Sequence, residues 1–315
     1  MALIKTTEEI RKYLKVDISE KESSFLPYVP DATEKYIKQY LGSDQLTELD
    51  EYYNDGEGEE DELLNNLLIH VQRALAKFTF LLAAPMLDLN ISEGGFTVRS
   101  TQNQAPASRE RVERFMQSLE RQAWDNIEML LAFLEENKDD YPLWADSDAY
   151  TMAMHNFINS AAEFDRLVPI GSSRLTFIYL RPAMDNVELT EIEPNISTEL
   201  SAAIKEQMLS GELSEANEKI LPNIKRAVAN FTFSKIELKD MSGSMETTYS
   251  HHMIFNQEKR EEYKRLGKWY LGEVIKTIEA SPDDYPEYME SDLYDPTSTS
   301  YENTQDSGIF IAGTP

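Results

Sequence analysis

The 315-residue sequence contains no cysteine and only four histidines. The absence of cysteine excludes disulfide bonds and thiolate metal sites. His70 stands inside an apolar helical pattern, which favours a structural role. His251 and His252 are adjacent, and neighbouring side chains point apart on a strand or helix, so they are poor joint ligands for one metal ion. We therefore expect neither a metal site nor a cofactor.

Long apolar runs are also missing. No uninterrupted apolar stretch reaches the ~18 residues of a membrane-spanning helix, so no such helix is expected. The N-terminal stretch MALIKTTEEIRKYLKVD lacks the apolar region of a secretory signal peptide. These absences predict a soluble protein without membrane contact, made in a reducing compartment or in a particle that assembles there.

Positive charge is scarce, with 30 Lys and Arg against 57 Asp and Glu and a net charge of −27. Both halves of the chain share this acidic excess. Binding to nucleic acid through its phosphates requires clustered lysine and arginine, so we expect no specific binding of DNA. An acidic surface keeps a protein soluble, or it repels DNA that passes within the ~8 Å range of screened charges.

Motifs of common enzymes are absent, including the phosphate-binding, dinucleotide-binding, nucleophile-elbow and zinc-protease patterns. The repeated pairs Asp139-Asp140 and Asp283-Asp284 are the best candidates for a carboxylate site. General acid–base catalysis needs a carboxyl group with a raised pKa in a cleft, whereas each pair precedes a Tyr-Pro that ends a helix. The acidic stretch 54–62 lacks the ligand spacing of a calcium loop. We predict that the protein is not an enzyme.

What the sequence does contain is a repeat. The stretch Gln72–Phe80 (QRALAKFTF) returns as Lys225–Phe233 (KRAVANFTF), an offset of 225 − 72 = 153 residues. A second motif, Asp-Asp-Tyr-Pro at 139–142, returns at 283–286, an offset of 283 − 139 = 144 residues. Two motif pairs in the same order at nearly constant offset indicate an internal duplication. The predicted domains are 1–150, 151–294 and a C-terminal tail, 295–315.

Each copy is predicted to contain two long helices. The first helix begins near Asp61 and ends at Pro85, and apolar residues recur along it at steps of four and three. The second spans about 106–137 in the first copy and 256–280 in the other. The residues of the 106–137 helix expected to face inward are Val112, Phe115, Leu119, Ile127, Leu130, Leu131 and Leu134.

A β-hairpin is predicted between the two long helices of each copy. Around the glycine turn at 93–95, and again around 242–244, apolar residues alternate with polar ones. A lone two-stranded hairpin is marginal in water, so each hairpin needs a neighbour in the same chain or in another. The residues predicted to form such contacts are Ile91, Gly94, Gly95, Phe96, Val98, Met245, Thr247, Tyr249, Ile309, Phe310 and Ile311.

The remaining segments give weaker signals. Thr6-x-x-Glu9 is a capping box that predicts a short helix. Pro27 and Pro30 are expected to break the next helical stretch, which would restart with Asp31 as its cap and stop at Gly42. Residues 151–175 are expected to join the copies, largely as one helix. The tail 295–315 has the composition of a disordered segment, but its apolar Ile309–Ile311 would dock by strand addition on a partner, or on its own domain.

A family resemblance follows from these segments. The opening IKTTEEIRKYL at 4–14, the stretch Gln72-Arg-Ala-Leu-Ala, its repeat Lys225-Arg-Ala-Val-Ala, and Phe177 with Leu180-Arg-Pro182 resemble the head-to-tail connector, or neck ring, proteins of tailed bacteriophages. They are most similar to versions from phages of Bacteroidales and from crAss-like phages. The resemblance covers about residues 1–294, and the family has one such module where this chain has two.

The resemblance implies a structural virion protein rather than an enzyme. It would form a ring of about twelve copies in the neck, between the portal protein and neighbouring neck or tail proteins, after assembly in the host cytoplasm. DNA would pass through the lumen without specific binding. The predicted fold class is mainly α, with two duplicated helical-bundle modules, stacked or side by side, that each contain a β-hairpin. The residues alone also fit a cytosolic helical-repeat adaptor for partner proteins.

Overall fold

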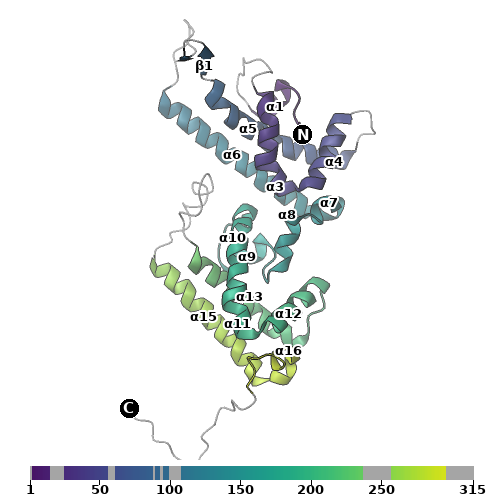
Figure 1. The fold of residues 1–315 in the computed structure, drawn as a ribbon, viewed down its shortest axis with the longest axis vertical. Helices are drawn as coiled ribbons and strands as arrows, with labels where there is room; N and C mark the ends of the chain where they lie inside the picture. Colours follow the sequence, from purple (N-terminus) through teal and green to yellow (C-terminus); the bar gives the residue numbers. More distant parts are fainter. Residues whose placement is uncertain are drawn as a thin grey trace, which may run out of the picture.

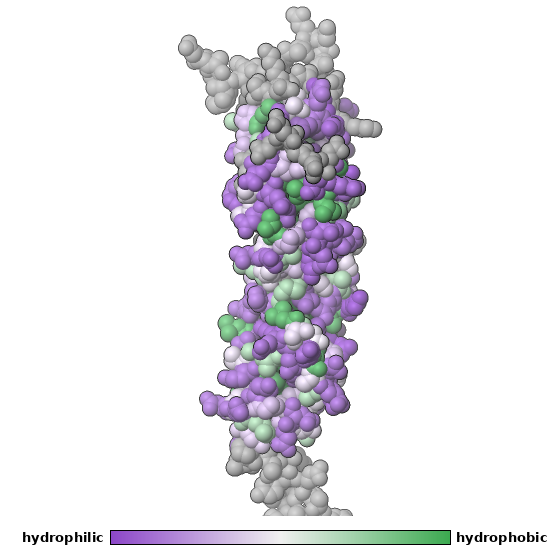
Figure 2. All heavy atoms as spheres, turned by 90° about the vertical axis from the view of Figure 1, so that its right-hand side faces the viewer, coloured by the Kyte–Doolittle hydropathy of each residue, from purple (hydrophilic) through white to green (hydrophobic). Residues whose placement is uncertain are grey.

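The computed structural model describes residues 2–14, 25–55, 61–87, 89–92, 95–98, 108–236 and 257–295. These residues are mainly α-helical, so the predicted mainly α fold class is confirmed. Figure 1 shows two groups of helices that follow one another along the longest axis of the molecule. Each group has a buried hydrophobic core. On the face drawn in Figure 2, the described residues are mostly hydrophilic, with small hydrophobic patches between them.

The first helix group is built around α5 (Glu62–Leu87), which packs against α6 (Arg109–Glu136). Ser108 precedes α6 in an extended conformation, and Asn137 ends it. The other helical elements of this group are shorter: α1 (Thr7–Tyr13), η2 (Leu26–Tyr28), α2 (Val29–Ala32), η3 (Thr33–Ile37), α3 (Lys38–Leu41), α4 (Ser43–Asp55), η4 (Lys138–Asp140), α7 (Pro142–Ala145), α8 (Asp148–Thr151) and η5 (Met152–His155).

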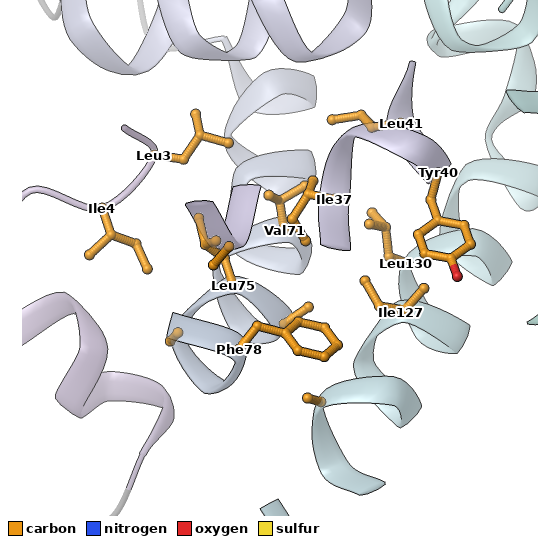
Figure 3. Close-up of a cluster of buried hydrophobic side chains, with 14 of the residues drawn as sticks. Leu3, Ile4, Ile37, Tyr40, Leu41, Val71, Leu75, Phe78, Ile127 and Leu130 are labelled. Atoms are coloured by element: carbon orange, nitrogen blue, oxygen red, sulfur yellow. The ribbon is translucent and has the colours of Figure 1, made fainter. Parts of the chain in front are cut away.

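Helix α5 is buried on most of its sides between Leu67 and Ala83. The predicted stripe through Val71, Leu75 and Phe78 is buried, but so are Ala74 and Ala76 on other faces. Figure 3 shows the residues that enclose this stripe from the N-terminal segment, from α3 and its neighbours, and from α6: Leu3, Ile4, Ile37, Tyr40, Leu41, Ile127 and Leu130. A helix with buried apolar residues on several faces lies at the centre of a core.

Helix α5 bears on the expectation that the chain has no membrane-spanning helix. Residues Glu62–Met86 are long and apolar enough, by length and composition alone, to cross a membrane, and 61% of the most apolar window is buried inside the structure. Scattered polar residues interrupt the apolar run, which is why a search for uninterrupted stretches missed it. The burial of the window is the pattern of a core helix.

The second helix group has α13 (Glu215–Lys235) packed against α15 (Gln257–Ala280). In Figure 1, α6 and α15 slope in the same direction. The shorter elements are α9 (Ala161–Leu167), α10 (Arg174–Val187), η6 (Glu188–Ile192), α11 (Glu193–Ile196), α12 (Thr198–Ser210), η8 (Pro282–Asp284) and α16 (Pro286–Met289).

Several local features of the first group recur in the second. Helices α1 and α9 are each 7 residues long, and each begins with a side-chain cap, from Thr6 and from Ser160. A π-helical segment of 5 residues, η3 or η6, leads in each group to a residue with positive φ and extended ψ. These residues are Gly42 (φ 80°, ψ 161°) and Ser197 (φ 75°, ψ 152°), and a 13-residue helix follows each.

A tyrosine ties each pair of long helices together. The hydroxyl of Tyr141 donates a hydrogen bond to the carbonyl oxygen of Leu63 at 2.9 Å. The hydroxyl of Tyr285 donates to that of Ala216 at 3.0 Å. Both tyrosines belong to the Asp-Asp-Tyr-Pro motif, and both are 2% exposed. The motif therefore anchors the chain after α6 and α15 to the start of α5 and α13.

Three prolines do not interrupt the helices as predicted. Pro27 and Pro30 lie in the first turns of η2 and α2, so the chain is helical from Leu26 to Leu41 and Asp31 caps nothing. A proline in a first turn needs no hydrogen-bond donor, because the amide there has no partner within the helix. Pro85 lies inside α5, which continues to Leu87. Gly42 ends α3 as predicted.

Two further predictions are wrong. Val112 and Phe115 do not face the core, since 46% and 41% of their surfaces are exposed. The five later positions predicted to face inward on α6, from Leu119 to Leu134, are buried. Residues 151–175 do not form one joining helix. The chain is extended at Asn156 and Ser160, and α9 belongs to the core of the second group.

The structure describes the predicted hairpin only in the first helix group. Strands β1 (Leu89–Ser92) and β2 (Gly95–Val98) pair antiparallel, with Ile91 opposite Phe96 and Ser92 opposite Gly95. The corresponding stretch of the second copy lies within residues 237–256, outside the described residues. Two copies with one hairpin each therefore remain a prediction.

Candidate functional site

The joint between the two helix groups centres on Glu128 of α6. Its carboxylate accepts hydrogen bonds from the backbone N–H groups of Arg174 at 2.6 Å and Leu175 at 3.1 Å, and from the Ser173 hydroxyl at 3.2 Å. These donors belong to the first turn of α10, where backbone N–H groups lack helical partners and a negative charge is stabilised. Glu128 thus caps a helix of the other group.

Further contacts widen this joint. The Arg174 guanidinium pairs with Glu135 at 2.6 Å and lies 3.7 Å from Glu128. Leu175 is 2% exposed and belongs to the core of the first group. Arg181 donates a hydrogen bond to the carbonyl oxygen of Ala149 at 3.4 Å. Charged, apolar and backbone groups of α10 therefore all contact the first helix group.

Tyr40 of α3 lies in the electrostatic field of this joint. Burial and, to a smaller extent, the negative charge of Glu128 raise the pKa of Tyr40 to about 12, while Arg181 opposes the increase. The carbonyl oxygen of Tyr40 accepts a hydrogen bond from the indole N–H of Trp144 at 3.0 Å. Tyr40 therefore stays neutral, as a packed part of the joint.

A second network fixes the segment that enters the second helix group. Glu188 of η6 accepts a hydrogen bond from the backbone N–H of Phe157 at 2.9 Å and pairs with Lys205 at 2.7 Å. Burial raises the pKa of Glu188, while Lys205 opposes that increase. Asn156 donates to Asp185 at 2.6 Å. These polar contacts hold the linker against η6 and α10.

Three exposed apolar side chains lie toward the hairpin end of the α5–α6 pair. They are Met86, Val112 and Phe115, which are 55%, 46% and 41% exposed. Phe115 contacts the partly buried Phe80 edge to face, with ring centroids 5.9 Å apart, and Phe80 stacks on Phe25. We call Met86, Val112 and Phe115 the arm patch. Val112 and Phe115 continue the apolar face of α6 beyond its buried positions.

Two adjacent hollows lie in the second helix group, on either side of Lys235. One, of about 360 Å³, is lined by charged residues around Phe231. The other, of about 370 Å³, is lined mainly by apolar residues of α10 and by Ile236. The two linings therefore differ in kind, although Lys235 belongs to both.

Few of the predicted contact residues are placed by the structure. Ile91 lies in β1, and Gly95, Phe96 and Val98 lie in β2, all at backbone level. The others lie outside the described residues: Gly94, Met245, Thr247, Tyr249, Ile309, Phe310 and Ile311. The structure therefore brings the four described contact residues together in the hairpin, and the role of all the predicted contact residues remains a prediction.

The other sequence candidates have structural surroundings. His70 stacks on Phe133 with centroids 4.3 Å apart, and burial lowers its pKa, helped by Arg73. Asp139 and Asp140 are exposed. Among the described residues, no group of three or more histidine, aspartate or glutamate side chains could hold a metal ion.

The joint residues were missed by sequence reasoning. Glu128 and Arg174 are 46 positions apart in the chain, and neither belongs to a motif. The second capping pair, Ser160 and Glu163, could have been found, because it repeats the spacing of Thr6 and Glu9.

Comparisons with known proteins add one match. Residues 37–153 match a family model described as a family of unknown function (DUF6712). The match spans the end of η3 to η5 and therefore lies in the first helix group. No curated protein matches the chain. No solved structure matches it either.

Proposed function

We propose that this chain is a structural subunit of the head-to-tail connector of a tailed bacteriophage. Copies of it form a closed ring of about twelve subunits by head-to-tail contacts. The ring lies between the portal protein and neighbouring neck or tail proteins, and DNA passes through its lumen. The family resemblance of residues 1–294 supplies this proposal, and the matched family of unknown function neither adds to it nor opposes it.

The observation that carries the proposal is the arm patch. A helix normally directs its apolar face at its own core. In α6 that face continues past Leu119 to Phe115 and Val112, which are exposed and which lie toward the hairpin. Two strands alone are marginal in water. An exposed apolar face beside such a hairpin fits a contact with a neighbouring subunit.

We also propose that the two helix groups are copies of one module. The recurring caps, π-helical segments, positive-φ residues and tyrosine anchors support this, because they fall at nearly constant offsets in the sequence. In this proposal the modules stack along the long axis of the chain. The Glu128 joint makes them one rod, so each subunit contributes two layers to the ring.

The charge of the chain suits a channel for DNA. A net charge of −27 repels a polyanion at short range. DNA would therefore pass a wall of such subunits without adhering to it. Lysine substitutions on lumen residues that leave DNA ejection unchanged would count against this part of the proposal.

The arm patch offers a direct test of assembly. We expect the full chain to form large particles in sedimentation velocity, and we expect Val112→Asp to abolish them, because it places a charge in the proposed contact. The matched control is Leu209→Asp, at an apolar α12 residue that is 59% exposed. Both variants should stay within about 0.5 kcal/mol of wild-type stability, since neither position is buried.

Two results would contradict the proposal. A wild-type chain that remains monomeric or dimeric at every concentration would favour a cytosolic adaptor, which needs no closed ring. Equal assembly of the Val112→Asp and wild-type chains would remove the arm patch from the contact.

A further inference from the structure

The hollow around Phe231 replaces an aromatic cluster of the first helix group. In that group Tyr36 of η3 stacks on Phe78 with centroids 4.1 Å apart, and Trp124 of α6 meets Phe78 edge to face at 5.1 Å. The offset of 153 pairs Phe78 with Phe231, and the offset of 144 pairs Trp124 with Lys268. The positions of η3 and η6 pair Tyr36 with Glu191. The second group thus has charged chains where the first has aromatic packing.

The charges lining this hollow are only partly compensated. Lys235 pairs with Glu191 at 2.9 Å. Arg260 and Lys264, one turn apart on α15, form no ion pair with any residue that the structure describes. Two uncompensated cations beside a hollow are unusual on a chain with a net charge of −27. They favour an acidic occupant.

The lining of the adjacent hollow favours an apolar occupant. Ile178, Tyr179, Pro182 and Ala183 of α10 line it together with Ile236. Lys235 lines both hollows. A single extended segment could therefore place a carboxylate beside Arg260 and Lys264 and an apolar side chain beside Ala183.

We propose that the C-terminal segment of a neighbouring copy, residues 302–311, occupies these two hollows. The segment carries Glu302 and Asp306 and then Ile309-Phe310-Ile311, and no lysine or arginine follows Asp295. Asp306 and Phe310 are four positions apart, which spans roughly 13 Å in an extended chain. Docking in a neighbour rests on the proposed ring, in which such tails link adjacent subunits.

A nucleic acid backbone is a poorer occupant. Glu191 and Glu261 also line the charged hollow, and they repel a continuous polyanion. The apolar hollow next to it offers a phosphate no hydrogen-bond donor other than Lys235 and the Tyr179 hydroxyl. A peptide in which isoleucine and phenylalanine follow carboxylates satisfies both linings.

Disulfide trapping in the full chain tests this inference, because the natural chain has no cysteine. We expect the double variant Phe310→Cys with Ala183→Cys, oxidised by copper phenanthroline, to give covalent dimers and higher multimers on a non-reducing gel. The control pairs Phe310→Cys with Leu209→Cys, at an exposed α12 position. Docking should make the first pair react at least about tenfold faster, since it raises the local thiol concentration.

A charge reversal probes the other hollow. Adding Arg260→Glu and Lys264→Glu to the Phe310–Ala183 cysteine pair should slow the cross-linking, because Asp306 then meets like charges. Unchanged cross-linking in this variant would overturn the electrostatic part of the proposal.

Several outcomes would overturn the inference as a whole. One is cross-linking no faster than in the control pair, and another is a disulfide confined within single chains. A third is a short DNA duplex that binds the wild-type chain and blocks the cross-link. A closed ring without the cross-link would remove this inference and leave the proposed function standing. An interchain cross-link in particles that are not rings would support docking of the tail and contradict the proposed connector ring.

Discussion

Removing the Glu128 carboxylate should loosen the joint between the helix groups. Its carboxylate accepts two backbone N–H groups of α10 and the Ser173 hydroxyl, and Arg174 lies nearby. A hydrogen bond to a charged group contributes about 1.5–3 kcal/mol, and losing a helix cap costs about 1 kcal/mol. These terms overlap, because Ser173 also caps α10 by accepting from the N–H of Thr176.

We therefore expect Glu128→Ala to lower the free energy of unfolding by about 2–3 kcal/mol. Glu128→Gln should cost about 1 kcal/mol, because the amide oxygen still accepts the backbone N–H groups without the charge. The matched control is Glu135→Ala, which removes a single partly exposed ion pair with Arg174 and should cost no more than about 1 kcal/mol.

Urea unfolding followed by circular dichroism measures these values, and small-angle scattering reports whether the rod bends. Glu128→Ala should add a separate early transition, because the two cores then unfold less cooperatively. The reasoning is refuted if Glu128→Ala costs no more than Glu135→Ala and scattering detects no added flexibility.

Three further predictions concern single positions. Gly267→Ala should destabilise the folded protein by about 1 kcal/mol, because the new Cβ would lie 2.8 Å from a buried phenylalanine ring. Gly272→Ala has open space around it and should stabilise the folded protein by up to about 1 kcal/mol in thermal unfolding. Ser197→Gly should raise the melting temperature and Gly42→Ala should lower it, since both positions have positive φ; equal signs would contradict this. Burial lowers the pKa of His70 in the folded protein, so its contribution to stability is present above pH ~6.5 and is lost as pH falls through the folded-state pKa. His70→Gln should therefore flatten the acid side of the plot of unfolding free energy against pH. An unchanged plot would contradict the lowered pKa of His70.

Local signals predicted the helices well where one principle dominated. The Thr6–Glu9 capping box forms as the sequence indicates, with the Thr6 oxygen accepting from the Glu9 N–H and the Glu9 carboxylate accepting from Thr6. Gly42 ends α3 because its φ of 80° suits glycine. Both observations depend on residues that are neighbours in sequence.

The predictions were wrong where the effect of a residue depends on its position within a helix. Pro27 and Pro30 break a helix only in its interior, and the sequence does not mark where the first turn lies. Val112 and Phe115 continue the helical phase of the α6 core, but periodicity does not show where the opposing surface ends.

The candidate interaction surfaces were still harder to predict from sequence. The Glu128 joint depends on how two helix groups pack, and its partners are distant in the chain. Charged residues line the hollow around Phe231 in the second group, whereas Phe78 of the first group stacks on Tyr36. This difference depends on contacts between helices that are distant in the chain.

Electron-microscope class averages of the native particle that contains this chain would test the connector assignment. We expect a closed ring of about twelve subunits, with the two helix groups of each subunit stacked as two layers. Particles that contain only one or two copies of the chain, with no closed ring, would contradict the connector assignment and favour the adaptor.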